Sequence, residues 1–324
     1  MLMESRAYTC IVRCERLLHT DAIWNDLLSW FRLPASCPCD HRPLVHGRVK
    51  GLRDLNINAM RARQSRPSVA RVYSYVLGGR DNYGVDKDVG DFFMGDLPGS
   101  EMLAITNRQA ILRAARDMAS DGIRQVIDMG CGLPTDENVH DVLRRKVPDA
   151  RVVYVDNDPF VVAHGRALLA IDENIAVVEA DVGDPAAIRE HPDVQRLIDF
   201  DEPVGIIFGV VLSFLDDEAD PAAVVRDWSQ RLAPESRVYI SHFRTGRTRE
   251  AVATERKIRD AFGVGTWRDE EKIKSFFGDL ELLEPGMAPC ARWRPEPPAP
   301  GTDPVQKDLS IWEDLIVAGM ARKR

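Results

Sequence analysis

The sequence predicts an α/β fold whose parallel sheet is covered by helices on both faces. Apolar, strand-like runs alternate with helix-length segments through the middle of the chain, an order typical of parallel sheets buried between helices. The run 124–135 (RQVIDMGCGLPT) has the pattern of a buried strand that ends in an acid and a glycine turn. A second such strand, at 151–156, also ends in an acid. Nucleoside-bearing cofactors bind at carboxyl strand ends of this kind.

Length and composition are those of a globular protein. The 324 residues suit one large domain or two small ones, and 44% are hydrophobic and 29% charged. The formal charge of -8 argues against a general nucleic-acid binder, which would carry a basic surface. No apolar run reaches the ~18 residues that cross a bilayer, and the start lacks a signal-peptide pattern. We therefore expect a cytoplasmic protein without a membrane partner.

Residues 1–60 differ from the rest of the chain. Residues 23–31 could form one short amphipathic helix, whereas 34–43 have no periodic pattern. Two interpretations stay open: a weakly ordered N-terminal extension, or sequence upstream of a true start at Met60.

The same segment holds a cluster of metal-ligating residue types: Cys10, Cys14, Cys37, Cys39, His41 and His46. Their C-x3-C and C-x-C spacings do not match the paired C-x2-C knuckles of zinc sites. We expect incidental thiols and no metal.

Two helices are predicted before the alternating region. The first, 68–77, ends at Gly78-Gly79, and the second covers 105–119. We expect 61–122 to form a helical lid or cap and 123–324 to form the cofactor-binding domain.

The alternating region supplies the sheet. Strands are predicted at Gln125–Asp128, Arg151–Asp156, Ala176–Glu179, Val204–Phe208 and Arg237–Ser241. Helices are predicted between them at Asn138–Lys146, Pro159–Ala170, Pro185–Leu197 and Pro221–Leu232. Two later strands, Leu280–Glu284 and Trp312–Ala318, flank a proline-rich run and suit an antiparallel pair at the sheet edge.

The glycine turn indicates which ligand binds. Gly130 and Gly132 let the backbone approach a ligand closely, but Thr135 stands where a dinucleotide fingerprint has its third glycine. Pro134 also removes one N–H donor that a diphosphate would use. A ligand that presents an ammonium group to Asp128 fits better.

Two further acids follow the next strands. Asp156 can accept both ribose hydroxyl protons, and Asp181 can accept from an adenine amino group. A single Asp at a strand end is commonly a helix cap, but three at successive strand ends, with the glycines, suit S-adenosylmethionine. The remaining predicted cofactor contacts are Cys131, as a small filler of the loop, with Asn157, Val182 and Val210.

These residues resemble class I S-adenosylmethionine-dependent methyltransferases, and most closely the actinobacterial S-adenosyl methyltransferase family, formerly a domain of unknown function. The resemblance covers about 67–322. It lies in four blocks: 70–83, 128–135 with 138–140, 154–159, and 281–286 with 292–295. It implies a Rossmann-like, seven-stranded sheet with an antiparallel last strand, and S-adenosylmethionine as cofactor. Ser213 and Ser74 depart from the His and Asp that relatives often have there.

Methyl transfer depends mainly on alignment and exclusion of water. We expect the acceptor above the ends of the fourth and fifth strands, beside 210–214 and 241–243. The predicted substrate and lid residues are Tyr73, Gly79, Asp81, Asn82, Tyr83, Arg108 and Ser213. The alternative for the lid is that Asp81-Asn82 caps the next helix and that Tyr73 and Tyr75 pack inside.

Candidate catalytic groups are few. His242 and His140 are candidate bases, each with a structural alternative, and Tyr83 is a further candidate. Arg108 could anchor an acidic group or form a surface ion pair.

The sequence therefore predicts a methyltransferase that acts on an unidentified small molecule or natural product at O or N. A noncatalytic S-adenosylmethionine-binding regulator and, less favoured, an NAD-dependent oxidoreductase are the alternatives.

Overall fold

The computed structural model describes residues 65–295 and 308–324. The residues from Arg61 to Arg324 belong to one unit. The predictions for 1–60 (the helix at 23–31, the start at Met60 and the cysteine cluster) lie outside the described residues.

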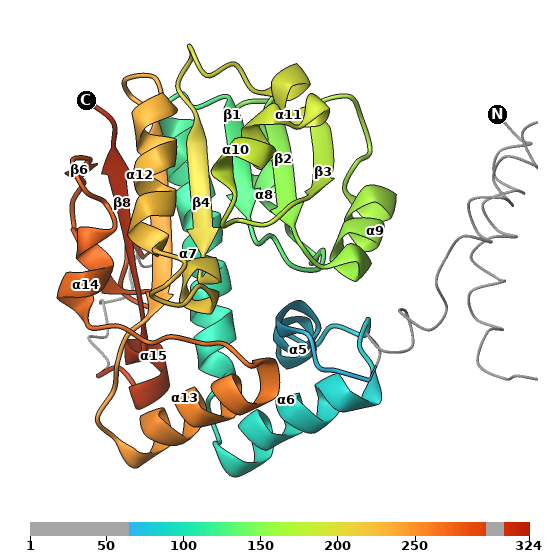
Figure 1. Cartoon of the computed structure of the whole chain (residues 1–324), viewed down its shortest axis with the longest axis vertical. Helices are drawn as coiled ribbons and strands as arrows, with labels where there is room; N and C mark the ends of the chain where they lie inside the picture. The colour runs from blue at the N-terminus through green and yellow to red at the C-terminus, as the bar shows by residue number, and fades with distance from the viewer. Residues whose placement is uncertain (1–64, 296–307) are drawn as a thin grey trace, which may run out of the picture. The chain divides into compact units, whose positions relative to one another are not determined.

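An eight-stranded sheet forms the centre of the described chain (Figure 1). Its order is β3 (Ile175–Glu179), β2 (Arg151–Asp156), β1 (Gln125–Met129), β4 (Gly205–Gly209), β5 (Arg237–Phe243), β8 (Ile316–Arg322) and β6 (Glu281–Leu282), with β7 (Ala288–Pro289) also paired to β8. The first five strands are parallel, and β8 runs antiparallel to β5. The parallel sheet and its antiparallel last strand are confirmed; the two-residue β7 is the strand beyond the expected seven.

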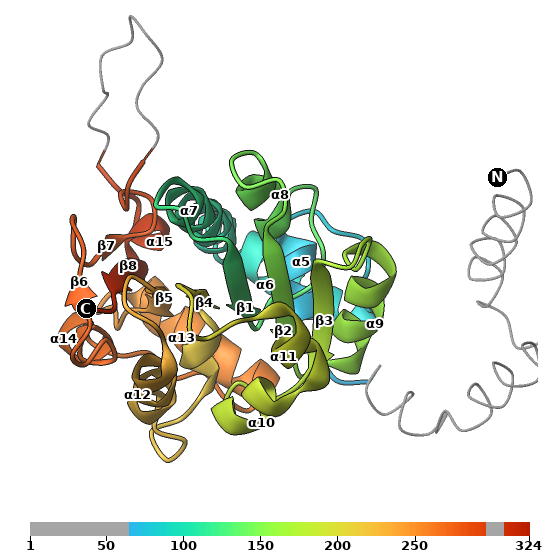
Figure 2. The same cartoon turned by 90° about the horizontal axis from the view of Figure 1, so that it is seen from above.

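Alternate strand residues enter two separate cores, because successive side chains of a strand point to opposite faces. Val126 lies in the core beneath α7 (Glu101–Ser120), α8 (Val139–Arg144) and α9 (Pro159–Leu168). Ile127 lies in the core beneath α10 (Pro185–Glu190), α11 (Pro192–Leu197) and α12 (Pro221–Arg231). Figure 2 shows α7 and α8 on one side of the sheet and α10 and α12 on the other, so the predicted cover on both faces is confirmed.

Several element boundaries differ from those predicted. The helix expected at 185–197 is two helices, since Pro192 lacks an N–H donor and His191 before it is extended. The strand expected from Trp312 begins only at Ile316, after the short helix α15 (Ile311–Asp314). Besides α15, three further helices lie outside the predicted ranges: α6 (Gly84–Asp96), α13 (Arg249–Phe262) and α14 (Glu270–Ser275).

The carboxyl ends of the parallel strands face α5 (Val69–Val76), α6 and α13 (Figure 1). In contrast, α7 packs against β4, β5 and β8. The division into a cap at 61–122 and a domain at 123–324 stays a prediction. None of the helices in the described ranges is long and apolar enough to span a membrane.

Candidate active site

Asp128 lies near the carboxyl end of β1 and is 4% exposed. Its carboxylate has no hydrogen-bond partner within 65–295 and 308–324, although its oxygens are not sealed off from solvent. Burial raises its pKa to about 7; the positive charge of Arg108 opposes the shift, and Asp156 adds to it. A buried carboxylate without donors favours a cationic partner.

The glycine turn after β1 brings the backbone close to its neighbours. Gly130 and Gly132 both have positive φ, 65° and 67°. A Cβ on Gly130 would lie 2.5 Å from Val211 Cγ2, so only glycine allows this approach. Cys131 between them donates its backbone N–H to the Val155 carbonyl, and burial raises its thiol pKa well above the ordinary value. That thiol is neutral, which agrees with a filler role.

Asp156, at the end of β2, joins two loops. One carboxylate oxygen accepts from Gly132 N at 3.0 Å and the other from Asp158 N at 3.0 Å. Burial raises its pKa, and these backbone donors partly offset the rise. The carboxylate is thus fixed between the glycine turn and the loop that follows β2.

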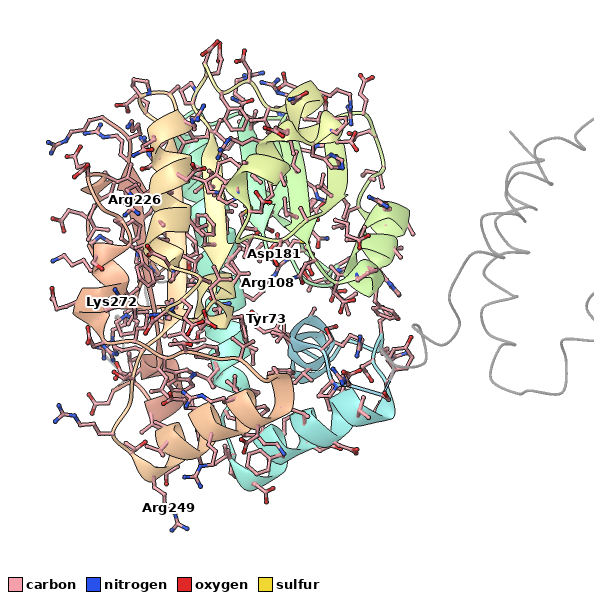
Figure 3. The ribbon with its side chains drawn as sticks, viewed as in Figure 1. Tyr73, Arg108, Asp181, Arg226, Arg249 and Lys272 are labelled. Atoms are coloured by element: carbon pink, nitrogen blue, oxygen red, sulfur yellow. The ribbon has the colours of Figure 1, made fainter. Side chains whose placement is uncertain are left out.

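The remaining predicted cofactor contacts lie further along this edge. Asp181 is exposed and accepts from Gly183 N at 2.8 Å, Asn157 is exposed, and Val182 is buried. In the view of Figure 3, Asp181, Arg108 and Tyr73 follow one another between the strand ends and α5.

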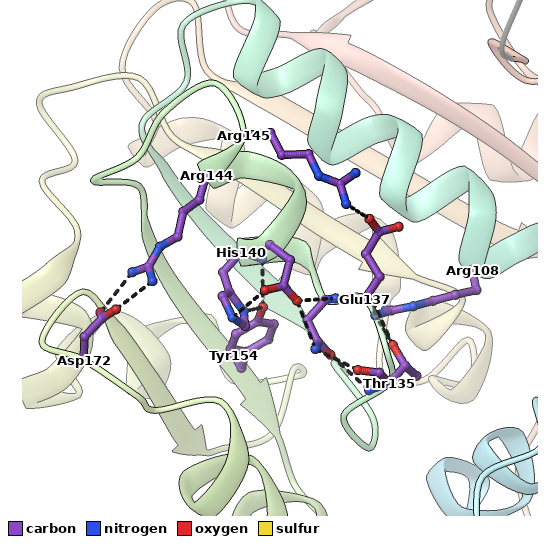
Figure 4. Close-up of polar contacts among 10 residues, drawn as sticks. Arg108, Thr135, Glu137, His140, Arg144, Arg145, Tyr154 and Asp172 are labelled. Atoms are coloured by element: carbon purple, nitrogen blue, oxygen red, sulfur yellow. Dashed lines mark hydrogen bonds and ion pairs between the residues drawn. The ribbon is translucent and has the colours of Figure 1, made fainter.

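Arg108 extends from α7 toward the glycine turn (Figure 4). Its Nη2 donates to Thr135 Oγ1 at 2.7 Å and to the Glu137 carbonyl at 2.6 Å. Its Nε is buried without a partner. Arg108 therefore holds the segment that follows the glycine turn.

A buried polar relay, which we define as Tyr73, Asn107 and Ser241, connects α5, α7 and β5. The Tyr73 hydroxyl donates to the Ala104 carbonyl at 2.9 Å and accepts from Asn107 Nδ2 at 3.1 Å. Ser241 Oγ donates to Asn107 Oδ1 at 2.6 Å and accepts from Val210 N at 3.1 Å. Burial raises the Tyr73 pKa to about 12, so this hydroxyl is neutral and fully engaged.

The segment 78–83 forms the turn from α5 into α6. A Cβ on Gly79 would lie 2.1 Å from Ser74 Oγ, so the turn requires glycine there. Asn82 Nδ2 donates to the Gly79 carbonyl at 3.0 Å, while its Oδ1 is buried without a partner. Asp81 is exposed. Tyr83 packs edge-on against Phe160 with ring centroids 5.6 Å apart.

Two contacts, not predicted, hold the N-terminal helices: one joins α5 to α6, and the other joins the start of α5 to the loop after β2. Arg71 Nε and Asp86 form an ion pair of 2.7 Å with side chains 3% and 0% exposed. Ser68 Oγ donates to Asp158 Oδ2 at 2.7 Å, beside Asp156. The N-terminal helices are therefore tied to the β2 loop.

Val210, after β4, has φ of 65°, which is a strained conformation for a β-branched residue. It begins the 3₁₀ turn η1 (Val211–Phe214). Ser213 in this turn is fully buried and its Oγ accepts from Phe243 N at 3.1 Å. Ser213 thus ties η1 to β5 and has no exposed surface for an acceptor.

His242 is fully buried with both ring nitrogens engaged. Nδ1 lies 2.8 Å from the Phe243 carbonyl, and Nε2 lies 3.0 Å from Arg268 Nη1, so the ring donates through Nδ1 and accepts at Nε2. Burial, with a smaller effect of Arg268, lowers its pKa to about 4. This geometry gives His242 a structural role, because neither nitrogen is free to accept a substrate proton.

His140 is also engaged. Its Nδ1 lies 2.7 Å from the Tyr154 hydroxyl, and its Nε2 lies 3.3 Å from Asp141 (Figure 4). Burial lowers its pKa. Its contacts likewise favour the structural alternative.

Aromatic side chains gather near the ends of β4 and β5. Trp267 stacks on Phe243 with centroids 4.9 Å apart and an interplanar angle of 1°. Phe214 meets Phe243 and Phe262 edge-on. We call Phe214, Phe243, Phe262 and Trp267 the aromatic wall.

Comparison with known families identifies the family to which the chain belongs. A family model described as S-adenosyl methyltransferase matches residues 56–324. The chain belongs to this family.

Two solved structures support the assignment. A candidate methyltransferase from Thermobifida fusca YX is 42% identical, with a TM-score of 0.75, over 80% of this chain and 96% of that one. A DUF574 family protein from Streptomyces avermitilis MA-4680 is 32% identical, with a TM-score of 0.73, over 81% of this chain and 99% of that one. The search of curated proteins found no match.

The residues of this S-adenosyl methyltransferase fit its cofactor, S-adenosylmethionine. The accessible, unpartnered carboxylate of Asp128 suits an ammonium group, and the positive φ of Gly130 and Gly132 forms the backbone turn that follows it. The protein is thus an S-adenosylmethionine-dependent methyltransferase.

Sequence reasoning missed Asn107 and Arg268. Asn107 directly precedes Arg108, a predicted site residue, and this position could have identified it. No motif surrounds Arg268.

Proposed function

We propose that this methyltransferase acts on an oxygen or nitrogen atom of a small molecule bound beside the ends of β4 and β5. The observation that carries the proposal is the aromatic wall at these strand ends. Phe243 and Trp267 are themselves buried, so the half-buried rings of Phe214 and Phe262 offer the aromatic surface, which favours an acceptor with an apolar or aromatic part.

The cofactor roles follow from position. We assign Asp128 to the methionyl ammonium, Asp156 to the ribose hydroxyls and Asp181 to the adenine amino group, with Gly130, Cys131 and Gly132 as the backbone turn beneath the ligand. Asn157, Val182 and Val210 are assigned to the adjoining surface. The fixed carboxylate of Asp156 between Gly132 N and Asp158 N supports a preorganised ribose contact.

When bound, S-adenosylmethionine supplies a methyl group already activated by a sulfonium charge. The chain's own contribution is then to align the acceptor and to exclude water. Tyr73, Gly79, Asp81, Asn82 and Tyr83 are proposed to cover the site from the α5–α6 side. The buried contacts of His242 and Ser213 support positioning roles for both. Tyr83 remains a candidate for contact with the acceptor.

Calorimetric titration with S-adenosylmethionine, S-adenosylhomocysteine and NAD tests the cofactor assignment. We expect binding of the first two and none of NAD. Incubation of the protein with methyl-labelled donor and fractionated small-molecule extracts tests catalysis; binding without any labelled product would favour a regulatory protein.

Asp156→Asn tests the ribose assignment. The amide keeps the size of the side chain but loses the charge and one acceptor oxygen, so affinity for S-adenosylhomocysteine should fall by about 10- to 100-fold, the effect of losing charge-assisted hydrogen bonds. Asp193→Asn, on the exposed start of α11, is the matched control. Unchanged affinity in Asp156→Asn contradicts the assignment.

A further inference from the structure

The guanidinium of Arg108 uses only one of its three nitrogens in hydrogen bonds to described residues. Nη2 makes both of its hydrogen bonds, to Thr135 and Glu137. Nε is buried and unpartnered, and Nη1 has no protein partner within the described residues yet is not sealed from solvent. A guanidinium held by one nitrogen, with its other donors free, is prepared for an acceptor that the protein does not supply.

Asp128 is a carboxylate near Arg108 that also lacks hydrogen-bond partners. Its oxygens accept no hydrogen bond within the described residues, and it is close enough for Arg108 to lower its pKa. The two nevertheless form no ion pair with each other within 65–295 and 308–324. Both groups therefore lie at the carboxyl end of β1, Asp128 on the strand itself and the Arg108 guanidinium against Thr135 and Glu137 in the segment that follows it.

The groups around the pair place it toward the cofactor rather than the acceptor. Arg108 interacts electrostatically with Tyr73, Cys131 and Tyr154 as well as with Asp128. Tyr154 is the β2 neighbour of Asp128, and Cys131 is in the glycine turn. All of these lie on β1, β2 or α5 or in the glycine turn after β1, whereas the aromatic wall belongs to the ends of β4 and β5 and the segments that follow them.

From the positions of these two charged groups, we propose that Arg108 binds the α-carboxylate of the cofactor's methionyl tail, while Asp128 binds its ammonium. The inference rests on the proposed cofactor site. The amino-acid end is a zwitterion, so its two charges match one anion and one cation held apart in the protein. A guanidinium is suited to a carboxylate because its donors lie in one plane. Arg108 thereby moves from the acceptor side, where the sequence had suggested it, to the cofactor side.

Decarboxylated S-adenosylmethionine provides the test, because it keeps the sulfonium and the ammonium but lacks the carboxylate. The wild-type protein should bind S-adenosylmethionine about 10- to 100-fold more tightly than the decarboxylated compound, the range of a charge-assisted hydrogen bond. Arg108→Met should lose most of this preference and bind the two compounds nearly equally. Asp128→Asn should weaken both by similar factors and keep the preference.

Two variants separate ligand contact from a structural effect on the turn. Arg108→Lys keeps the charge and should recover part of the preference. Arg145→Met removes an exposed arginine that contacts the same residue, Glu137, through its side chain, and should leave the preference intact. Thermal unfolding of each variant checks the fold.

The outcomes distinguish this proposal from the cofactor site itself. If wild-type protein binds neither compound, the proposed cofactor site fails. If it binds both equally, or if Arg108→Met weakens both by the same factor, the site stands and the carboxylate assignment is overturned. In the second case, Arg108 would act only by holding Thr135 and Glu137.

Discussion

The ionised carboxylate of Asp128 destabilises the unliganded fold, although the same charge is suited to bind an ammonium group. Its carboxylate is 4% exposed and lacks a hydrogen-bond donor among the described residues. Burial raises its pKa from 3.8 to about 7. The folded state therefore binds this proton more tightly than the unfolded state, so the group's contribution to stability is most favourable below pH 3.8 and declines as the pH rises to about 7.

Asp128→Asn should remove this pH dependence. Between pH 5 and pH 8, the unliganded wild type should lose about 3 kcal/mol relative to the variant, since the effect accumulates over the two pH units below the folded pKa and each unit corresponds to about 1.4 kcal/mol. Its affinity for S-adenosylhomocysteine should rise over the same range as the carboxylate ionises, whereas the variant should bind weakly throughout. Urea unfolding and calorimetry at both pH values measure this; parallel stability curves for the two proteins would contradict it.

His242 makes the opposite contribution. Its pKa is lowered to about 4, chiefly by burial, so the unfolded state takes up the proton first. The stability from the neutral ring is present above about pH 6.5, the ordinary His value, and is lost as the pH falls toward 4.

Replacing His242 with Gln provides the corresponding test, because an amide can donate to the Phe243 carbonyl and accept from Arg268 without titrating. The acid-induced loss of stability between pH 6.5 and pH 4 should shrink by about 2 to 3 kcal/mol, and affinity for S-adenosylhomocysteine should be unchanged. Acid unfolding followed by circular dichroism checks the first expectation and calorimetry the second. A large loss of affinity would show that His242 faces the ligand.

Residue pairings were the part of the site that the sequence could not predict. The acids at successive strand ends were identifiable because a strand pattern and a glycine turn mark their positions locally. The partners of His242 and Ser241 were not, since Arg268 follows 26 residues later and Asn107 precedes Ser241 by 134. Such contacts depend on how α7 and the loop after α13 pack, and no local periodicity encodes that.

At the level of elements, strands were predicted well and connecting helices less so. Buried parallel strands are short runs of apolar residues with sharp ends, which makes them easy to recognise. In contrast, α13 (REAVATERKIRDAF) is rich in charge and buries only three residues, Ala251, Thr254 and Ile258. Its pattern resembles a solvated segment, so its helical structure was missed.

The buried polar relay connects α5 to β5 through hydrogen bonds to Asn107. Tyr73 and Ser241 do not hydrogen-bond to each other, but both bind the amide of Asn107. Tyr73→Phe or Ser241→Ala alone should cost about 1 to 3 kcal/mol, because each leaves a buried polar group unpaired.

A double-mutant cycle of these two substitutions should give a coupling energy of about 0.5 to 3 kcal/mol in chemical unfolding. The matched cycle pairs Tyr73→Phe with Ser229→Ala; Ser229 is on the exposed side of α12 and bonds only within its own helix. That cycle should be additive. Additivity in both cycles would mean that α5 and β5 are energetically independent.

For the whole molecule, the sheet order links distant parts of the chain into one site. Parallel strands place their carboxyl ends at one edge, so Asp128, Asp156 and Asp181 lie at that edge although two helical connections, α8 and α9, separate them in the chain. Alternation alone predicted a parallel sheet. The antiparallel last strand came from the resemblance and from the proline-rich connection before it, because periodicity does not encode strand order.

The chain that begins at Met60 is expected to carry the complete cofactor site. Every residue assigned to the cofactor lies between Arg108 and Val210, and the attachments of α5 to the sheet begin at Ser68. The 61–324 unit also holds both cores beneath the sheet faces. The Met60 protein and the full chain should therefore bind S-adenosylhomocysteine with equal affinity and unfold at the same temperature in its presence. Calorimetry and scanning calorimetry of the two proteins, purified in parallel, measure both quantities. Weaker binding by the shorter protein would show that residues before Met60 contribute to the site, and a lower unfolding temperature at equal affinity would show that they contribute to stability alone.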